Sequence, residues 1–245
     1  AVVEGAAQYD RALPMMMTAA GTVPAAKVFV MGAGVAGLQA IATARRLGAV
    51  VTATDVRAAA GEQVESLGAK FIMSDALKDA SGEGGYAREL TDDEKAEQAA
   101  LVAGHIAKQD LVITTALIPG RPAPKLVSKD MVDSMQPGSV LVDLAVERGG
   151  NVEGAKSDEV VVTKNGVSIV GYENMAGRIG ATASQLYAKN LYAFLETLVE
   201  KGEEGAESKL NINTEDELVS ATLLTHGGAV VHPAFAPQDS KGDAA

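Results

Sequence analysis

Short runs of apolar residues alternate with longer stretches of helical spacing along most of the chain. The runs predict strands at 27–31, 50–54, 69–73, 110–114 and 139–143. The stretches between them predict helices at 35–47, 59–67, 92–107 and 128–135. Strands that alternate with helices in this way are typical of a parallel sheet covered on both faces. We therefore predict an α/β protein with a doubly wound, Rossmann-type sheet over residues 25–175.

The two ends of the chain have different patterns. Residues 2–13 have helical spacing, and "PMMMTAAGTVP" is expected to be a loop, so we interpret 1–24 as a helix and linker from an N-terminal domain. After two β-rich runs around an Asn-Gly turn signal, a helix is expected at 180–200. Weak strand signals follow at 218–231, before a polar tether. We assign 176–245 to a returning helix, a C-terminal segment and that tether, the remnants of a second α/β domain. The returning helix has an apolar face that must pack on something, formed by Leu186, Leu191, Phe194, Leu195 and Leu198.

Composition excludes several classes of function. The 245 residues are 47% apolar, which is ample for a core, and carry a formal charge of −11 with few aromatic residues, which disfavours nucleic acid as a partner. Without cysteine there are no disulfides or thiolate sites, and His105, His226 and His232 are too scattered to suggest a metal site. No apolar run of about 18 residues predicts a membrane span. The chain lacks an initiator Met and a secretory signal, so we expect a piece of a longer polypeptide.

A glycine motif follows the first predicted strand of the sheet. Gly32, Gly34 and Gly37 form G-x-G-x-x-G at the start of a helix, where the glycines permit the turn, the approach of a pyrophosphate and close packing of the helix. A simple packing turn would show the same spacing. Asp55 ends the second strand, 23 residues after Gly32, which suits a carboxylate that binds ribose hydroxyls. Because strand, glycines, helix and acid agree in order, we predict a dinucleotide site.

Asp55 also bears on the choice of cofactor. A carboxylate at this position would repel a 2′-phosphate and so favours NAD over NADP. Arg57 argues the other way, since a guanidinium can pair with a phosphate. We weigh the acid at the strand end more heavily and predict NAD.

Two loops are expected beside this site. Residues 74–90 have no clear periodicity, and Gly82, Gly84 and Gly85 with Tyr86 suit either a lid over a cofactor or an ordinary surface loop. The proline-rich "TTALIPGRPAPKL" follows the fourth strand and would line the crevice or form a stiff turn, with Asp143 and "YENMAGR" in the same region.

A general base is not evident in the sequence. Dehydrogenases of alcohols or amines need one near the nicotinamide, whereas His105 falls in a helix where a surface role is expected, and the other histidines lie near the C-terminus. Either the base lies on an absent segment or the reaction needs none, as in hydride transfer between two nicotinamides.

Longer blocks of sequence resemble a known family. "TAAGTVPAAKVFVMGAGVAGLQAIATARRLGAVVTATDVR", "EQVESLGAKF", "GGYA", "TTALIPGRPAPKL", "MVDSMQPGSVLVDLAVERGGN" and "SQLYAKNL" are similar to the NAD(H)-binding component of proton-translocating NAD(P) transhydrogenase, in its alpha subunit, which is related to alanine dehydrogenase. The resemblance implies an oxidoreductase component that binds NAD(H). It would exchange a hydride directly with NADP(H) on a partner component, while membrane subunits translocate protons.

Site residues follow from the same resemblance, position by position. It places Val35 at the phosphate turn, Asp55, Val56 and Arg57 around the adenosine ribose, and Gly85 with Tyr86 in a mobile loop. It adds Gln98 and Leu117 as cofactor contacts, and it implies no catalytic side chain and no metal in this chain.

The chain departs from the family in lacking an N-terminal domain with an arginine-glutamine-aspartate loop. The family implies a homodimer, peripheral to the cytoplasmic face of a bacterial inner membrane or in the mitochondrial matrix. Two alternatives stay open: a fragment of an alanine dehydrogenase-like enzyme, and a non-catalytic module that binds NAD(H).

Overall fold

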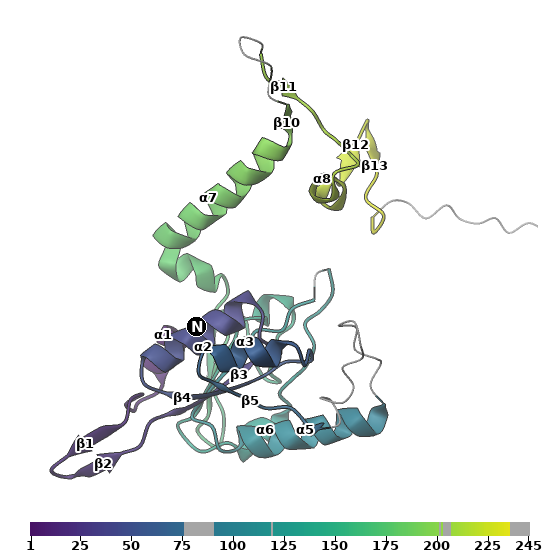
Figure 1. Ribbon diagram of the computed structural model, residues 1–245. Helices are drawn as coiled ribbons and strands as arrows, with labels where there is room; N and C mark the ends of the chain where they lie inside the picture. Colours follow the sequence, from purple (N-terminus) through teal and green to yellow (C-terminus); the bar gives the residue numbers. More distant parts are fainter. Residues whose placement is uncertain (76–90, 119, 201, 203–206, 236–245) are drawn as a thin grey trace, which may run out of the picture. The chain divides into compact units, whose positions relative to one another are not determined.

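A seven-stranded sheet is the centre of the computed structural model, which describes residues 1–75, 91–118, 120–200, 202 and 207–235 (Figure 1). The strand order is β5-β4-β3-β6-β7-β9-β8. All neighbours pair in parallel except β8 and β9, which form an antiparallel hairpin at one edge. The strands are β3 (Lys27–Met31), β4 (Val50–Thr54), β5 (Lys70–Phe71), β6 (Leu111–Thr114), β7 (Val140–Asp143), β8 (Val160–Val162) and β9 (Ser168–Val170). The predicted doubly wound α/β fold is confirmed, with a mixed rather than wholly parallel sheet.

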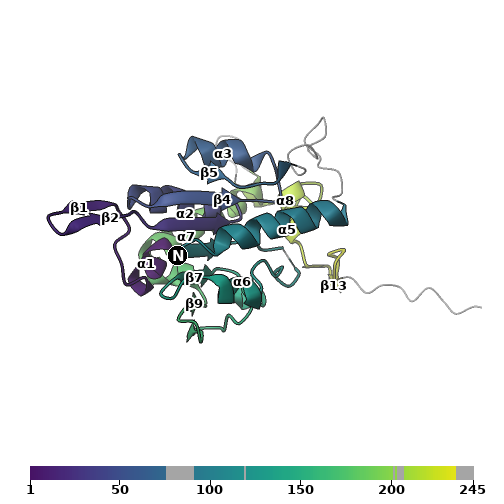
Figure 2. The same cartoon turned by 90° about the horizontal axis from the view of Figure 1, so that it is seen from below.

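Helices cover both faces of this sheet (Figures 1 and 2). One face carries α1 (Val2–Gln8), α2 (Val35–Arg46) and α3 (Ala60–Ser66), and the other carries α5 (Asp92–Ile106) and α6 (Lys129–Ser134). Successive residues of a strand point to opposite faces. In β3, Val28 and Val30 accordingly enter the core under α1–α3, while Phe29 and Met31 enter the core under α5 and α6. All four are at most 4% exposed, so an apolar run without alternation is what this strand requires.

The N-terminal segment differs from its expected form. Helix α1 packs on the sheet through buried Val2 and Tyr9, and a Cβ at Gly5 would lie only 2.7 Å from Leu111 Cδ1. The loop expected at 14–24 is wrong, because β1 (Met16–Thr18) and β2 (Gly21–Val23) pair as an antiparallel hairpin. Its turn is fixed by Thr18, whose hydroxyl accepts from the Ala20 N–H at 3.1 Å, and by Gly21 with a φ of +126°.

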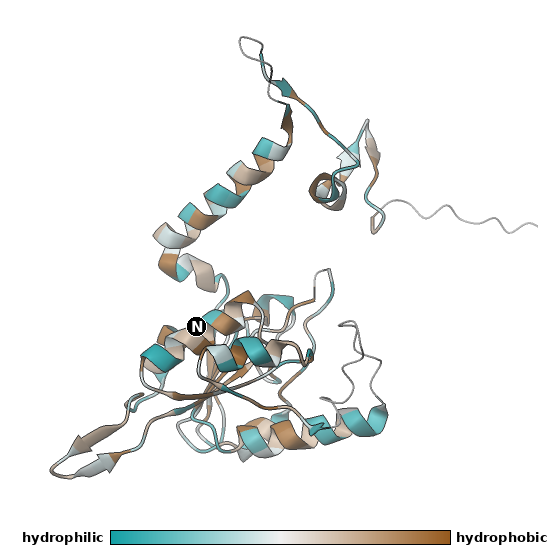
Figure 3. Cartoon of the chain, in the orientation of Figure 1, coloured by the Kyte–Doolittle hydropathy of each residue, from teal (hydrophilic) through white to brown (hydrophobic). Residues whose placement is uncertain are grey.

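Residues from Ala176 onward form a second compact unit. Its elements are α7 (Gly180–Thr197), β10 (Val199–Glu200), β11 (Lys209–Leu210), α8 (Glu217–Thr222), β12 (Thr225–His226) and β13 (Ala229–Val230), after a short helix η2 (Met175–Ile179). No side chain of α7 is buried, and Leu186, Leu191 and Leu195 are 47–59% exposed among polar neighbours (Figure 3). Nothing in the described part of the chain therefore covers the apolar face of this helix.

The strand signals expected at 218–231 are half right. Residues 225–230 form the hairpin of β12 and β13, but 217–222 form α8. The Asp216 carboxylate accepts from the N–H groups of Leu218 and Val219 at 2.9 and 3.1 Å. This cap satisfies backbone donors at the first turn and favours a helix over the strand that the β-branched residues suggest.

Candidate functional site

The glycine turn joins β3 to α2, and packing requires two of its three glycines. Gly32 has a φ of +106°, and a Cβ there would overlap the hydroxyl of Thr115. That hydroxyl lies 3.3 Å from the carbonyl oxygens of both Met31 and Gly32 and fixes the turn. A Cβ at Gly37 would lie 2.8 Å from the carbonyl carbon of Gly32 and nearer still to its oxygen, so only glycine lets α2 approach this closely.

Gly34 is not explained by packing. Its φ of −76° suits any residue, and a Cβ there would meet no atom within 4 Å. It is the N-cap of α2 and provides no side-chain cap, so backbone N–H groups of the first turn face outward with the positive end of the helix dipole. The turn thus combines a rigid backbone with an open, anion-attracting helix end, which is the arrangement that binds phosphate groups.

Asp55 lies directly beside this turn, at the end of β4. Its side chain is 8% exposed. Oδ2 accepts from the Ala33 N–H at 2.7 Å, and Oδ1 accepts from the Arg57 N–H at 2.9 Å. Burial acts to raise the pKa of Asp55, but the hydrogen bonds from the Arg57 side chain and from these two N–H groups outweigh it and hold the pKa below its ordinary value. Asp55 is therefore an ionised carboxylate in a protected position.

The Arg57 side chain folds back over Asp55. Its Nε donates to Oδ1 at 2.9 Å and its Nη2 to Oδ2 at 3.2 Å, while Nη2 also lies 3.4 Å from the carbonyl oxygen of Ala33. The hydrogen bond to Asp55 raises the pKa of Arg57, which is charged in any case. The guanidinium is 61% exposed, so it sits on the solvent side of the carboxylate.

Three exposed apolar side chains surround the turn and the acid. Val35, Val56 and Leu117 are 90%, 79% and 53% exposed, and they follow β3, β4 and β6, which are adjacent strands. The carboxyl ends of these strands are level, because Met31 pairs with both Thr54 and Thr114. The predicted residues thus gather at one edge of the sheet, where open α/β sheets bind their ligands. Apolar groups this exposed can cover the rings of a bound nucleotide.

Gln98 reaches the same edge from α5. Its Oε1 accepts from the Ser74 N–H at 2.8 Å, and its Nε2 donates to Thr54 Oγ1 at 3.2 Å. Thr54 immediately precedes Asp55, so Gln98 ties the acid-bearing strand to the segment that follows β5. Only the family resemblance pointed to this glutamine. Gly85 and Tyr86, the other two predicted contacts, lie outside the described residues.

Asn151 is a residue that the sequence did not single out. It is fully buried, and its side chain holds both arms of the proline-rich loop. Oδ1 accepts from the Ala116 N–H at 3.1 Å, while Nδ2 donates to the carbonyl oxygens of Ala116 and Pro124 at 2.9 and 2.8 Å. Nearby, buried Asp143 accepts from the N–H groups of Ala145 and Val152, both at 2.9 Å. Asp143 is therefore a scaffold for the loop that carries Leu117.

His105 does not have the surface role expected of it. Its ring packs edge-on against Phe29 at a centroid distance of 4.8 Å, and Nε2 lies 2.8 Å from Thr52 Oγ1. Burial, followed by the positive charges of Lys108 and Lys70, lowers the pKa of His105. The ring is consequently a neutral part of the packing between α5 and the sheet. In the part of the chain that the structure describes, no three acidic or histidine side chains converge as metal ligands.

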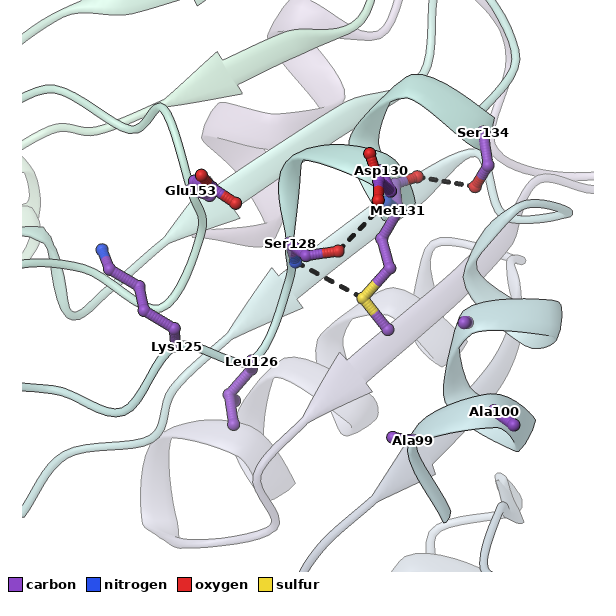
Figure 4. A pocket seen from close by; sticks show the side chains of 10 residues that line it. Ala99, Ala100, Lys125, Leu126, Ser128, Asp130, Met131, Ser134 and Glu153 are labelled. Atoms are coloured by element: carbon purple, nitrogen blue, oxygen red, sulfur yellow. Dashed lines mark hydrogen bonds between the residues drawn. The ribbon is translucent and has the colours of Figure 1, made fainter. Parts of the chain in front are cut away.

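The most distinct hollows lie away from this edge. A groove of about 590 Å³ runs between α5 and α6, lined by Ala99, Ala103, Leu126 and Met131 (Figure 4). The hydrogen bonds within it join Ser128 and Met131 at the N-terminus of α6. A second hollow of about 730 Å³ lies beside the β8–β9 hairpin. Neither is lined by a predicted cofactor residue, so we place the candidate site at the open edge formed by the turn, Asp55 and Leu117.

No helix in the described ranges combines the length and apolarity needed to cross a bilayer.

Comparisons with known proteins identify the family. Residues 1–233 match the family described as "Alanine dehydrogenase/PNT, C-terminal domain". The first of the parts into which the NAD(P) transhydrogenase alpha subunit of Rhodospirillum rubrum is divided is 56% identical over 97% of this chain and 61% of its own length. Alanine dehydrogenase of Halomonas elongata is 30% identical over 88% of this chain and 52% of its own length.

Solved structures agree with this assignment. The transhydrogenase from Sinorhizobium meliloti is 67% identical with a TM-score of 0.80, over 94% of this chain and 60% of that one. An L-alanine dehydrogenase is 26% identical with a TM-score of 0.68, over 95% and 57%. The chain thus spans about three fifths of the length of these transhydrogenase relatives. The resemblance found in the sequence is confirmed, and the chain belongs to the alanine dehydrogenase/PNT C-terminal domain family, with transhydrogenase alpha subunits among its relatives.

Proposed function

We propose that this chain is the NAD(H)-binding component of a proton-translocating transhydrogenase, and that it exchanges a hydride with NADP(H) held by a partner component. The observation that carries the proposal is the ionised, 8% exposed Asp55 beside the glycine turn, with Gly34 left open at the N-terminus of α2. The identity of 56% to a transhydrogenase alpha polypeptide supports the choice of reaction.

The residues at the edge of the sheet have separate tasks in this proposal. The N-terminus of α2 binds the pyrophosphate through backbone N–H groups and the helix dipole. Asp55 accepts hydrogen bonds from the adenosine ribose, and its charge disfavours a 2′-phosphate, so NAD(H) is preferred. Val35, Val56 and Leu117 contact apolar surface and exclude water.

The nicotinamide of a bound cofactor supplies or accepts the hydride. Exchange between two nicotinamides releases no substrate proton, so the protein contributes position and shielding from water rather than a general base. Asn151 serves this purpose indirectly, since it fixes the loop on which Leu117 lies. A hydride travels only between groups in direct contact, so the partner component must dock on this edge of the sheet.

A second candidate is an amino-acid dehydrogenase. The family includes alanine dehydrogenases, and one relative of that name is 30% identical. Such an enzyme needs a general base, which would have to come from outside the described residues of this edge, where His105 is neutral and packed on Phe29.

Calorimetric titration with NADH and NADPH tests the cofactor assignment. Asp55→Ala should weaken NADH binding by about 1–3 kcal/mol, roughly 5- to 150-fold, because the ribose loses an ionised hydrogen-bond partner. NADPH binding should weaken less or improve, since a repulsive charge is gone. Tighter binding of NADPH than of NADH by the unmodified protein would contradict the assignment.

A transfer assay tests the reaction. The chain, and a version extended by the N-terminal segment of its transhydrogenase relatives, are mixed with the NADP(H)-binding component, NADH and an NADP analogue. We expect NADH-dependent reduction of the analogue with the extended version. If that version binds NADH, transfers nothing to the analogue and instead oxidises alanine, the amino-acid dehydrogenase is the better assignment.

A further inference from the structure

The carboxylate of Asp55 has no acceptor position to spare. Two carboxylate oxygens offer about four lone-pair sites. Four donors already use them: the Ala33 N–H at 2.7 Å, the Arg57 N–H at 2.9 Å, Arg57 Nε at 2.9 Å and Arg57 Nη2 at 3.2 Å. Two of these donors belong to the backbone and two to a guanidinium. A ribose that is to donate both hydroxyls to Asp55 must first gain positions on it.

We propose that Arg57 is a specificity-determining residue that competes with the cofactor: its guanidinium occupies the positions on Asp55 that the ribose hydroxyls of NAD(H) take, and it leaves when the cofactor binds. This inference rests on the proposed function, because it assigns the ribose to Asp55. It differs from that function in treating Arg57 as an opponent of NAD(H) binding rather than as one more contact.

The two kinds of donor differ in freedom to move. The backbone N–H groups are fixed by the glycine turn and by the end of β4, so they continue to stabilise the carboxylate after the guanidinium has left. The Arg57 side chain is 61% exposed and is held on its other side only by the Ala33 carbonyl oxygen at 3.4 Å. Its two N–H donors match two ribose hydroxyl donors in number. The exchange therefore leaves the number of hydrogen bonds to Asp55 unchanged.

The same exchange affects the choice between cofactors. NADH displaces the guanidinium and thereby loses part of its binding free energy. NADPH carries a 2′-phosphate in place of one hydroxyl, which Asp55 repels and a guanidinium attracts. Arg57 therefore opposes NADH and assists NADPH, and it narrows the discrimination that Asp55 provides. In the rival arrangement the guanidinium stays on Asp55 and donates its remaining N–H groups to ribose oxygens, which would make Arg57 a ligand of NADH.

Titration of Arg57→Ala with NADH and NADPH separates the two arrangements by sign. Competition predicts NADH binding that is about two- to fivefold tighter, the range expected for releasing an exposed ion pair, and NADPH binding that is weaker. Arg57→Lys should fall between the two proteins, because an ammonium cannot make the two-point contact. Arg46→Ala is the control, since it removes the same charge at the far end of α2.

A double-mutant cycle adds a test that a general charge effect would not pass. In the Asp55→Ala background the gain from Arg57→Ala should vanish, because there is no carboxylate left to compete for. Weaker or unchanged NADH binding by Arg57→Ala overturns the inference and leaves the proposed function intact. Failure of the unmodified chain to bind NADH at all overturns both.

Discussion

Two substitutions in the glycine turn should separate folding from cofactor binding. Gly37→Ala places a methyl group 2.8 Å from the carbonyl carbon of Gly32, against backbone on both sides. Turn and helix would have to separate by roughly 1 Å or more to restore an ordinary contact. Overpacking of this kind costs about 1–3 kcal/mol. In a chain of this size that lowers Tm by about 2–12 °C.

Gly34→Ala makes the same chemical change three residues earlier with a different expected result. Its Cβ meets no atom within 4 Å, and the φ of −76° needs no glycine. Alanine is a poorer N-cap than glycine by about 0.5–1 kcal/mol, but it restricts the unfolded chain by about 0.4–1 kcal/mol. The two effects offset each other, so Tm should change by less than about 3 °C.

Cofactor binding should respond to Gly34→Ala instead. The new methyl group projects where a pyrophosphate must approach the first turn of α2, so NADH binding should weaken by about tenfold or more. Thermal denaturation and calorimetric titration of the same two variants provide the measurements. A Gly34→Ala protein that binds NADH as tightly as the parent would refute the assignment of this turn to phosphate. Equal loss of Tm in both variants would refute the packing argument.

Two further predictions concern buried side chains beside the site. Asn151→Ala leaves the Ala116 N–H and the Ala116 and Pro124 carbonyl oxygens without their partner, so the free energy of unfolding in urea should fall by about 2–4 kcal/mol, and a loss below about 1 kcal/mol would contradict this role. The pKa of His105 is lowered in the folded protein, so the unfolded chain binds more protons below the ordinary pKa near 6.5 and stability falls as pH drops through and below that value. His105→Gln, which keeps a donor for Thr52 Oγ1, should lose less stability than the parent between pH 7.5 and 5.5, and an equal loss would show that other groups cause it.

The central strands could be predicted from the sequence because their apolar runs are unbroken. Residues 27–31 and 50–54 form strands with the predicted bounds, since both faces of the sheet are covered and every position favours an apolar side chain. The edge strand β5 is shorter than predicted and covers only Lys70–Phe71. Central strands are specified by burial on both sides, whereas edge strands depend on a single neighbour.

Other features depend on contacts between residues that are distant in sequence. His105 looked like a surface residue because its helix has weak apolar periodicity, and only the sheet shows that Phe29 and Thr52 receive its ring. Asn151 makes its hydrogen bonds to residues 27 and 35 positions away, which no local pattern signals. Asp55 was found because its spacing from a motif is regular, but that spacing says nothing of the guanidinium that occupies its carboxylate.

The Asn151 amide has a consequence for changing the protein by design. Pro122 and Pro124 have no backbone N–H, so the loop that contains them has few donors with which to hold itself. A side chain from outside fixes it instead, at Ala116 on one arm and Pro124 on the other. The path of the loop is thus written elsewhere in the chain, and the residues between these two anchors are available for exchange. Loops grafted between Ala116 and Pro124 would inherit the same pair of attachment points, which makes this the natural place to alter what the edge of the sheet contacts.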